Sequence, residues 1–136
     1  MAELPPQVVG TGLEHVVVPV GESAALDRAA PDAAALRPLL AEHGCTCAYL
    51  VHVDAVREAA GARSFFLAGP DVREDPATGS AAGPLMAYAH ARTGGARLAG
   101  DQGVAMGRPS RLRCEAGERV RVAGDAVVVF ESTIEL

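Results

Sequence analysis

Runs of apolar residues, separated by Gly and Pro, divide the chain into short segments and predict a mixture of strands and helices. Residues 7–20 are rich in Val, and the run 16–20 predicts a strand that is buried on both faces and ends with its proline. Further strands are predicted at residues 45–53 and 63–67. The segment 54–61 is expected to connect these two strands.

Two helical segments are predicted between the strand at residues 16–20 and the strand at residues 45–53. Residues 23–29 and 32–43 carry helix-forming side chains, and Asp32 provides a start signal while Gly44 provides a stop. Pro38 lies inside the second segment. Because proline cannot donate the hydrogen bond that a helix interior needs, we expect it to kink or shorten this helix.

The middle of the chain combines a predicted loop with a predicted buried helix. Residues 68–77 contain two prolines, two aspartates and a glycine, which favours a loop. Residues 80–93 favour a helix, carry almost no charge, and are followed by Gly94 as a stop signal. A helix that is apolar on every side is expected to be buried.

Short strands are predicted again near the C-terminus, at residues 111–115, 118–123 and 126–132, with the last two joined by a turn at 124–125. Many short strands around one apolar helix predict an α+β fold. In this fold a curved mixed β-sheet, or barrel, wraps around a central buried α-helix. The length of 136 residues fits a single domain, residues 1–136.

The charge balance excludes several classes of partner and chemistry. The chain has 17 acidic and 12 basic residues, and its formal net charge is −5. It therefore has no cationic field that would bind nucleic acid. All 12 basic residues are Arg. The absence of Lys excludes Schiff-base chemistry, a pyridoxal-phosphate lysine and the Walker-A lysine.

Cysteines and histidines give no sign of a metal or redox centre. Of the three cysteines, Cys45 and Cys47 are two positions apart on one predicted strand, too near to form a disulfide without distortion. The four histidines are scattered singly, so surface or packed roles are expected and no metal. No apolar stretch approaches the length of a membrane span, and the N-terminus lacks export features. We therefore expect a cytoplasmic protein without membrane contacts.

The loop that enters the uncharged helix carries the candidate chemistry. Thr78 or Ser80 can cap the helix, and Gly79 lets a ligand approach the backbone. The unpaired N–H groups of this first turn, which includes Ala81, and the positive end of the helix dipole favour a small anion such as a carboxylate. Asp75 lies just before the turn, where it could orient the ligand or carry a proton if apolar surroundings raised its pKa.

A simpler interpretation explains the same residues, because a Ser or Thr cap with nearby acids begins many helices. The serine stands one place away from a G-x-S-x-G nucleophile elbow, and no dinucleotide-binding fingerprint is present. Glu74 and two residues of a second Gly- and Pro-rich segment, Gln102 and Arg108, are further candidates for a cleft. Arg108 either clamps a carboxylate or is only a surface charge.

Three stretches of the chain resemble one known family. Residues 12–20, 63–81 and 100–110, with the element Asp-Pro-Ala-Thr-Gly-Ser at 75–80, are similar in order and spacing to the PhzF-type phenazine-biosynthesis family. Diaminopimelate epimerase and proline racemase are its relatives by fold. The resemblance spans nearly the whole chain.

The resemblance implies two similar halves, each a curved sheet or barrel around a central helix, with the active site between them. Enzymes of this kind use no cofactor and isomerise or epimerise small carboxylic acids by moving a proton. The resemblance also implies that Asp75, Gly79 and Ser80 hold the substrate and help the transfer, with Thr78 and Ala81 beside them at the helix start. A role in secondary metabolism would follow.

The chain departs from the family because it resembles only the C-terminal half, and the other half supplies the catalytic glutamate. Three hypotheses remain: an isomerase whose base comes from a second chain, a non-catalytic homodimer that binds a small carboxylate, or a fragment of a two-domain enzyme. A lone half would expose the apolar face that its counterpart covers. We therefore expect a homodimer or pairing with a complementary half-domain.

Overall fold

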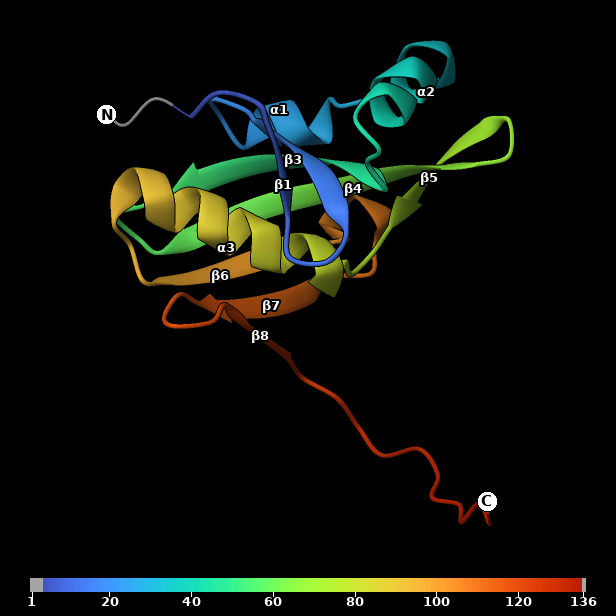
Figure 1. The fold of residues 1–136 in the computed structure, drawn as a ribbon, viewed down its shortest axis with the longest axis vertical. Helices are drawn as coiled ribbons and strands as arrows, with labels where there is room; N and C mark the ends of the chain where they lie inside the picture. The colour runs from blue at the N-terminus through green and yellow to red at the C-terminus, as the bar shows by residue number, and fades with distance from the viewer. Residues whose placement is uncertain (1–3, 136) are drawn as a thin grey trace.

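The computed structural model describes residues 4–135 and shows one curled, mixed β-sheet with three α-helices (Figure 1). Its strands are β1 (Gln7–Gly10), β2 (Glu14–Pro19), β3 (Cys47–Asp54), β4 (Ala59–Ala68), β5 (Asp71–Asp75), β6 (Arg97–Gln102), β7 (Ser110–Glu115) and β8 (Arg121–Gly124). The helices are α1 (Ala24–Asp27), α2 (Ala33–Glu42) and α3 (Gly79–Thr93), with a 3₁₀ turn, η1, at Val104–Met106.

The strand order is β1-β2-β3-β4-β6-β7-β8, and β5 pairs with β4 outside this path. β2 is parallel to β3, β4 is parallel to β6, and the remaining pairs are antiparallel. A parallel pair needs a crossover connection. Here α1 and α2 make the first crossover, and β5 with α3 makes the second.

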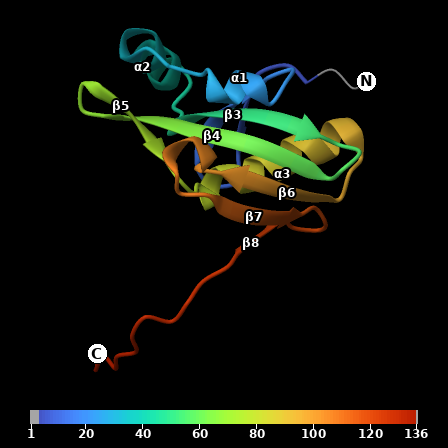
Figure 2. The ribbon, with the colours of Figure 1, turned by 180° about the vertical axis from the view of Figure 1, so that it is seen from behind.

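The sheet curls around α3 and covers it when the molecule is seen from behind (Figure 2). α3 contacts β1, β2, β6, β7 and β8, so strands from both ends of the sheet reach it. Neighbouring segments come close at Gly83, where an added Cβ would lie 3.3 Å from Thr11 Oγ1 and 3.6 Å from Val122. The predicted α+β fold, a curved mixed sheet wrapped around a central buried helix, is confirmed.

Two hydrophobic cores lie on opposite faces of the sheet. Because side chains alternate along a strand, β2 and β3 contribute to both cores, as predicted for a strand buried on both faces. The first core packs against α3 and includes Val17, Tyr49, Val51, Leu85 and Met86. The second core packs against α2 and includes Val16, Leu36, Leu40, Ala48 and Phe65.

The predicted helices are confirmed, with different ends. α1 is shorter than the predicted 23–29. α2 begins after Asp32, whose side chain accepts hydrogen bonds from the amides of Ala34 and Ala35 at 3.2 Å. Pro38 does not shorten α2, which runs on to Glu42. α3 ends at Gly94, whose left-handed φ of 73° and hydrogen bond to the His90 carbonyl confirm the predicted stop.

The predicted loop at 68–77 is wrong, because half of it forms β5, which pairs with β4. The chain reverses at Gly69, which has a φ of +64°. Proline and aspartate in this segment therefore mark a tight turn and a strand end instead of one long loop. Half of the segment 54–61 likewise belongs to strands, and only residues 55–58 connect β3 to β4.

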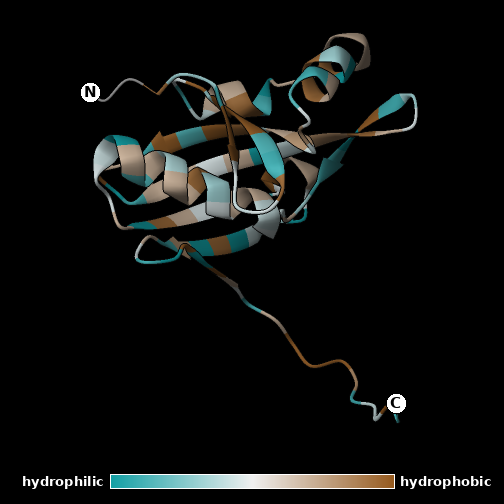
Figure 3. Cartoon of the chain, viewed as in Figure 1, coloured by the Kyte–Doolittle hydropathy of each residue, from teal (hydrophilic) through white to brown (hydrophobic). Residues whose placement is uncertain are grey.

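The predicted C-terminal strands also need correction. The hairpin turn lies at residues 116–120 instead of 124–125. The strand β6 is not among the strands that the sequence predicts. The predicted strand 126–132 is wrong, because the chain leaves the sheet after β8 and extends from the body (Figures 1 and 3). The apolar side chains of 127–130 are 78–84% exposed there. β propensity alone does not make a strand without a neighbour to pair with.

The three cysteines are free thiols, of which Cys47 and Cys114 are buried and Cys45 is half-buried. Within residues 4–135, no group of three or more His, Cys, Asp or Glu side chains could hold a metal ion. No helix in this part of the chain is long and apolar enough to cross a membrane.

Two glycines beside η1 offer a test of the backbone that supports the loop after β6. Gly103 and Gly107 both have left-handed φ values, of 76° and 67°. A Cβ on Gly103 would collide with the carbonyl oxygens of Arg108 and Pro76, whereas a Cβ on Gly107 would meet nothing within 4 Å. Gly103→Ala should therefore destabilise the protein by more than about 3 kcal/mol, and Gly107→Ala by about 1–2 kcal/mol. Urea unfolding measures both values, and equal losses would contradict the packing described here.

Candidate functional site

The candidate site lies where β5 ends and α3 begins. Pro76 ends the strand because it cannot donate to the sheet ladder. The amides of Ala81 and Ala82 make the first hydrogen bonds of the helix, both to the Thr78 carbonyl at 3.1 Å. The amides of Gly79 and Ser80 precede these bonds, and both residues are exposed. Two backbone donors thus lie at the open, positive end of a 15-residue helix.

Neither predicted side-chain cap is present. Thr78 occupies the cap position but makes no side-chain capping bond, and its hydroxyl instead donates to Asp75 Oδ2 at 2.6 Å. The Ser80 hydroxyl has no hydrogen-bond partner within residues 4–135. Plain helix capping therefore does not explain these residues. Ala81 is buried and its amide is already bonded, so among the first-turn residues Gly79 and Ser80 remain available to a ligand.

Gln102 organises the loop from beneath. Its side chain is fully buried, and its Nε2 donates to the Asp75 carbonyl at 2.7 Å and to Thr78 Oγ1 at 2.9 Å. Its Oε1 accepts from Tyr49 Oη at 2.9 Å and from the Thr78 amide at 3.3 Å. These four bonds use the full capacity of an amide side chain. Gln102, predicted as a cleft residue, therefore holds the loop in place and is not open to a ligand.

Burial raises the pKa of the Tyr49 hydroxyl above its usual range, with smaller contributions from neighbouring charges. Tyr49 thus remains protonated and acts as a donor to Gln102. Asp75 Oδ2 is held by Thr78, and no donor among the described residues reaches Oδ1. One carboxylate oxygen is therefore anchored while the other is available.

Glu74, the neighbour of Asp75, serves a different purpose. It forms a two-bond ion pair with Arg63, at 2.9 Å and 2.7 Å, and Arg63 also donates to the carbonyls of Leu26 and Ala29. The hydrogen bond to Glu74 is the main cause that raises the pKa of Arg63. Because side chains alternate, Glu74 lies on the opposite face of β5 from Asp75. The structure does not bring Glu74 together with the other candidates.

Arg108 lies on the loop that packs against Pro76. Its amide donates to the Gly103 carbonyl at 3.0 Å, and its side chain is exposed and makes no ion pair within residues 4–135. The backbone of Arg108 therefore lies near the loop before α3, because an added Cβ on Gly103 would meet both the Arg108 and the Pro76 carbonyl oxygens. Both roles predicted for it, clamp and surface charge, are compatible with this position.

A buried polar cluster beneath the first turn of α3 was not predicted. His15 and Cys47 are partners in the register of β2 and β3, and His15 Nδ1 lies 3.2 Å from Cys47 Sγ. The Ser64 hydroxyl donates to the same sulfur at 3.4 Å. The register of two parallel strands decides this contact, and no signal along the sequence reveals that register.

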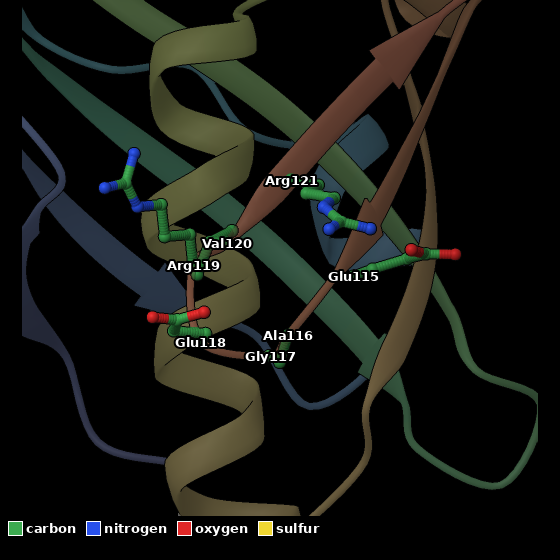
Figure 4. A pocket seen from close by; sticks show the side chains of 7 residues that line it. All are labelled: Glu115, Ala116, Gly117, Glu118, Arg119, Val120 and Arg121. Carbon is green, nitrogen blue, oxygen red and sulfur yellow. The ribbon is translucent and has the colours of Figure 1, made fainter.

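The structure also has a surface hollow of about 330 Å³ at the β7–β8 hairpin (Figure 4). It is lined by residues 115–121 and contains none of the candidate site residues. Two glutamates, Glu115 and Glu118, and two arginines, Arg119 and Arg121, line it, so no charge dominates. The hollow gives no support to a ligand site, and the candidate site remains at the start of α3.

Sequence comparisons show which known proteins the chain is similar to. The family model PhzC-PhzF, described as "Phenazine biosynthesis-like protein", matches residues 1–132. The uncharacterized isomerase YddE of Escherichia coli K12 is 31% identical over 147 residues, covering 98% of this chain and 49% of that protein. An uncharacterized isomerase of Pseudomonas aeruginosa is 44% identical over 71 residues, covering 50% of this chain and 27% of that protein. The YddE proteins of two Escherichia coli strains match nearly the whole of this chain. The chain spans only about half of their length.

Solved structures show the same fold. A Bacillus anthracis phenazine biosynthesis protein of the PhzF family has a TM-score of 0.66 at 20% identity, over 89% of this chain and 45% of that one. A Pseudomonas aeruginosa protein described as a predicted epimerase has a TM-score of 0.62 at 29% identity, over 94% of this chain and 46% of that one. This chain therefore corresponds in fold to one half of these longer proteins.

The Gln102 network leads to a stability prediction. Gln102→Leu removes four hydrogen bonds and leaves the buried Tyr49 hydroxyl without an acceptor, which should cost about 3 kcal/mol. Adding Tyr49→Phe removes that unpaired hydroxyl, so the double variant should lose about 1 kcal/mol less than the sum of the two single variants. Chemical unfolding of the four proteins measures this coupling. Strictly additive losses would show that the two side chains do not act together.

Proposed function

Since this chain belongs to the PhzC-PhzF family of phenazine biosynthesis-like proteins, we propose that it forms one half of the active site of a cofactor-independent isomerase or epimerase. The reaction moves a proton on a small carboxylic acid. The observation that carries this proposal is the open first turn of α3, with two unbonded amides next to an anchored carboxylate. The isomerase and epimerase names of the relatives support it.

The amides of Gly79 and Ser80 bind the substrate carboxylate, and the Ser80 hydroxyl adds a third donor. The helix dipole strengthens these bonds, and the first turn contains no acidic residue that would compete with an anion. Charge-assisted hydrogen bonds of this kind are about twice as strong as neutral ones. Substrate binding therefore uses backbone groups that the fold already places in position.

Asp75 handles the proton or orients the group that carries it. Thr78 and Gln102 fix the carboxylate and the backbone of this residue, so Oδ1 keeps one direction relative to the bound acid. A group that is positioned within hydrogen-bond reach of the reacting proton is what general acid–base catalysis requires. Asp75 is the one described carboxylate that adjoins the open turn.

Isomerisation removes a proton at one position and returns it at another, so a second proton-handling group has to face Asp75. A second half-domain supplies this group and covers the exposed first turn of α3. The lengths of the relatives support this arrangement, because the chain corresponds to about half of each. In a preparation of this chain alone, the second half-domain is another copy of the chain, and the two copies share two-fold symmetry.

Asp75→Asn tests the proton transfer. The protein is incubated in deuterated water with a panel of small cyclic, unsaturated and amino carboxylic acids, and deuterium at carbon is followed by NMR. We expect label to enter one acid with the unchanged protein and none with Asp75→Asn, because the amide cannot accept the proton. Asp101→Asn is the matched control, since Asp101 forms a surface ion pair with Arg111.

Two outcomes would contradict the proposal. Deuterium exchange by Asp75→Asn equal to that of the unchanged protein would exclude the role given to this carboxylate. Binding without exchange in all variants would favour a non-catalytic binding protein.

The oligomeric state tests the second half-domain. Light scattering of the purified chain at several concentrations should give twice the mass of one chain, because the exposed turn and apolar surface are covered by a second copy. A mass of one chain at every concentration would contradict the homodimer. The second half-domain would then have to come from a different polypeptide segment.

A further inference from the structure

The tail after β8, residues 125–135, carries five of the ten large apolar side chains that are exposed in residues 4–135. Four of them are consecutive, at 127–130, and Ile134 follows. The tail extends away from the sheet and the helices (Figures 1 and 3). Contiguous exposed apolar residues mark interaction sites in proteins, so this segment needs a partner.

The tail belongs to the part of the chain that the family model covers. The PhzC-PhzF model matches residues 1–132, and the alignment with YddE covers 98% of the chain. Residues 126–133 contain neither Gly nor Pro and are rich in β-branched side chains, which favours a strand once a neighbouring strand is present. The tail is therefore a strand-forming segment without a neighbour.

The sheet of the same chain cannot supply this neighbour. In the pairing of β7 with β8, Leu112 lies opposite Gly124. Continuing the same register would place Val127 opposite Pro109, which directly precedes β7 and has no N–H to donate. The ladder with β7 therefore stops where the apolar run begins.

A second strand edge is open next to the tail. β8 is the last strand of the sheet, so one of its edges is free, and all four of its residues are exposed. The Val122 side chain points towards α3, because an added Cβ on Gly83 would lie 3.6 Å from its Cγ2. Side chains alternate along a strand, so Arg121 points to the outer face. A free edge of this kind pairs readily with another strand.

The tail of a second copy is complementary to this edge. The two copies of β8 and the tail can run antiparallel, with Ala126 opposite its counterpart in the other copy. Phe130 then lies opposite Val122, and both side chains are on the face towards α3. Glu131 lies opposite Arg121 on the outer face, and neither forms an ion pair within residues 4–135. A slip by one residue would break the apolar pair and the charged pair together.

We propose that the tail is an exchanged strand, which joins two copies of this chain by pairing with the free edge of β8 in the other copy. Both tails are covered at once, because the two pairings are related by a two-fold axis between the Ala126 residues. The choice of a second copy as partner rests on the proposed function. The joined edge lies beside α3, since Val122 approaches Gly83 in the second turn of that helix.

Exchanging charges tests this pairing on the full-length chain, with the dimer dissociation constant measured by analytical ultracentrifugation. Glu131→Arg and Arg121→Glu each place two like-charged pairs in a dimer, so each variant alone should have a dissociation constant about tenfold higher or more. A mixture of the two variants restores both pairs, and its constant should return to within about threefold of the original. A contact within one chain would give no recovery on mixing, and that result would overturn the proposal.

Proline substitutions test the backbone pairing. Donors alternate along a strand, so one of Val128→Pro and Val129→Pro removes an N–H that faces the other copy. That variant should raise the dissociation constant by about tenfold or more. Glu135→Pro is the matched control, because it lies in the tail beyond the residues opposite β8, and it should change the constant by less than about threefold. The replaced valines are exposed, so thermal unfolding of the chain should stay unchanged and separate lost pairing from a lost fold.

These measurements separate the exchanged strand from the proposed function. A dimer that neither proline variant weakens would overturn the exchanged strand and leave the proposed reaction in place. A chain that stays monomeric at every concentration would also overturn the exchanged strand. A dimer that depends on the tail but moves no deuterium into any acid would contradict the proposed reaction and support the exchanged strand.

Discussion

One buried amide side chain, that of Gln102, determines where the candidate site residues of this protein lie. It bonds the Asp75 carbonyl, the Thr78 hydroxyl and the Thr78 amide, and Tyr49 fixes its orientation. Since every donor and acceptor of the amide is used, the loop before α3 has one satisfied arrangement in which Gln102 is buried. The direction of the Asp75 carboxylate and the start of the helix both follow from this arrangement.

The curl of the sheet explains why this loop is the candidate site of the chain. Strands from both ends of the sheet reach α3, and its middle is buried, with Gly83 allowing a close approach. The two ends of α3 stay open, and Gly79 and Ser80 are exposed in its first turn. A helix N-terminus attracts anions, so the same packing that buries the helix presents its positive end to a ligand. The open turn is also where a second half-domain would complete the site.

Local signals predicted what depends on neighbouring residues in the sequence. The limits of α3 and the stop at Gly94 follow from local preferences, and the open first turn at Gly79 and Ser80 follows from the start of that helix. Pairing between distant segments was not predictable in this way. The composition of residues 68–77 predicts a loop, whereas β5 forms there by pairing with β4 across a turn. The composition of residues 126–132 predicts a strand, whereas this segment follows β8 and pairs with no strand among residues 4–135. Glu74 and Asp75 are adjacent, yet the strand places them on opposite faces. The contact of His15 with Cys47 depends on strand register in the same way.

The most direct test of this account is whether the first turn of α3 binds a carboxylate. Acetate is titrated into ¹⁵N-labelled protein at constant ionic strength, with chloride as the control anion, and backbone amide shifts are followed by NMR. We expect the amides of Gly79 and Ser80 to shift along a saturating curve with acetate, while those of Gly94 and Gly95 at the other end of the helix stay in place. Shifts that do not saturate, or that are equal at both ends of α3, would contradict the central claim.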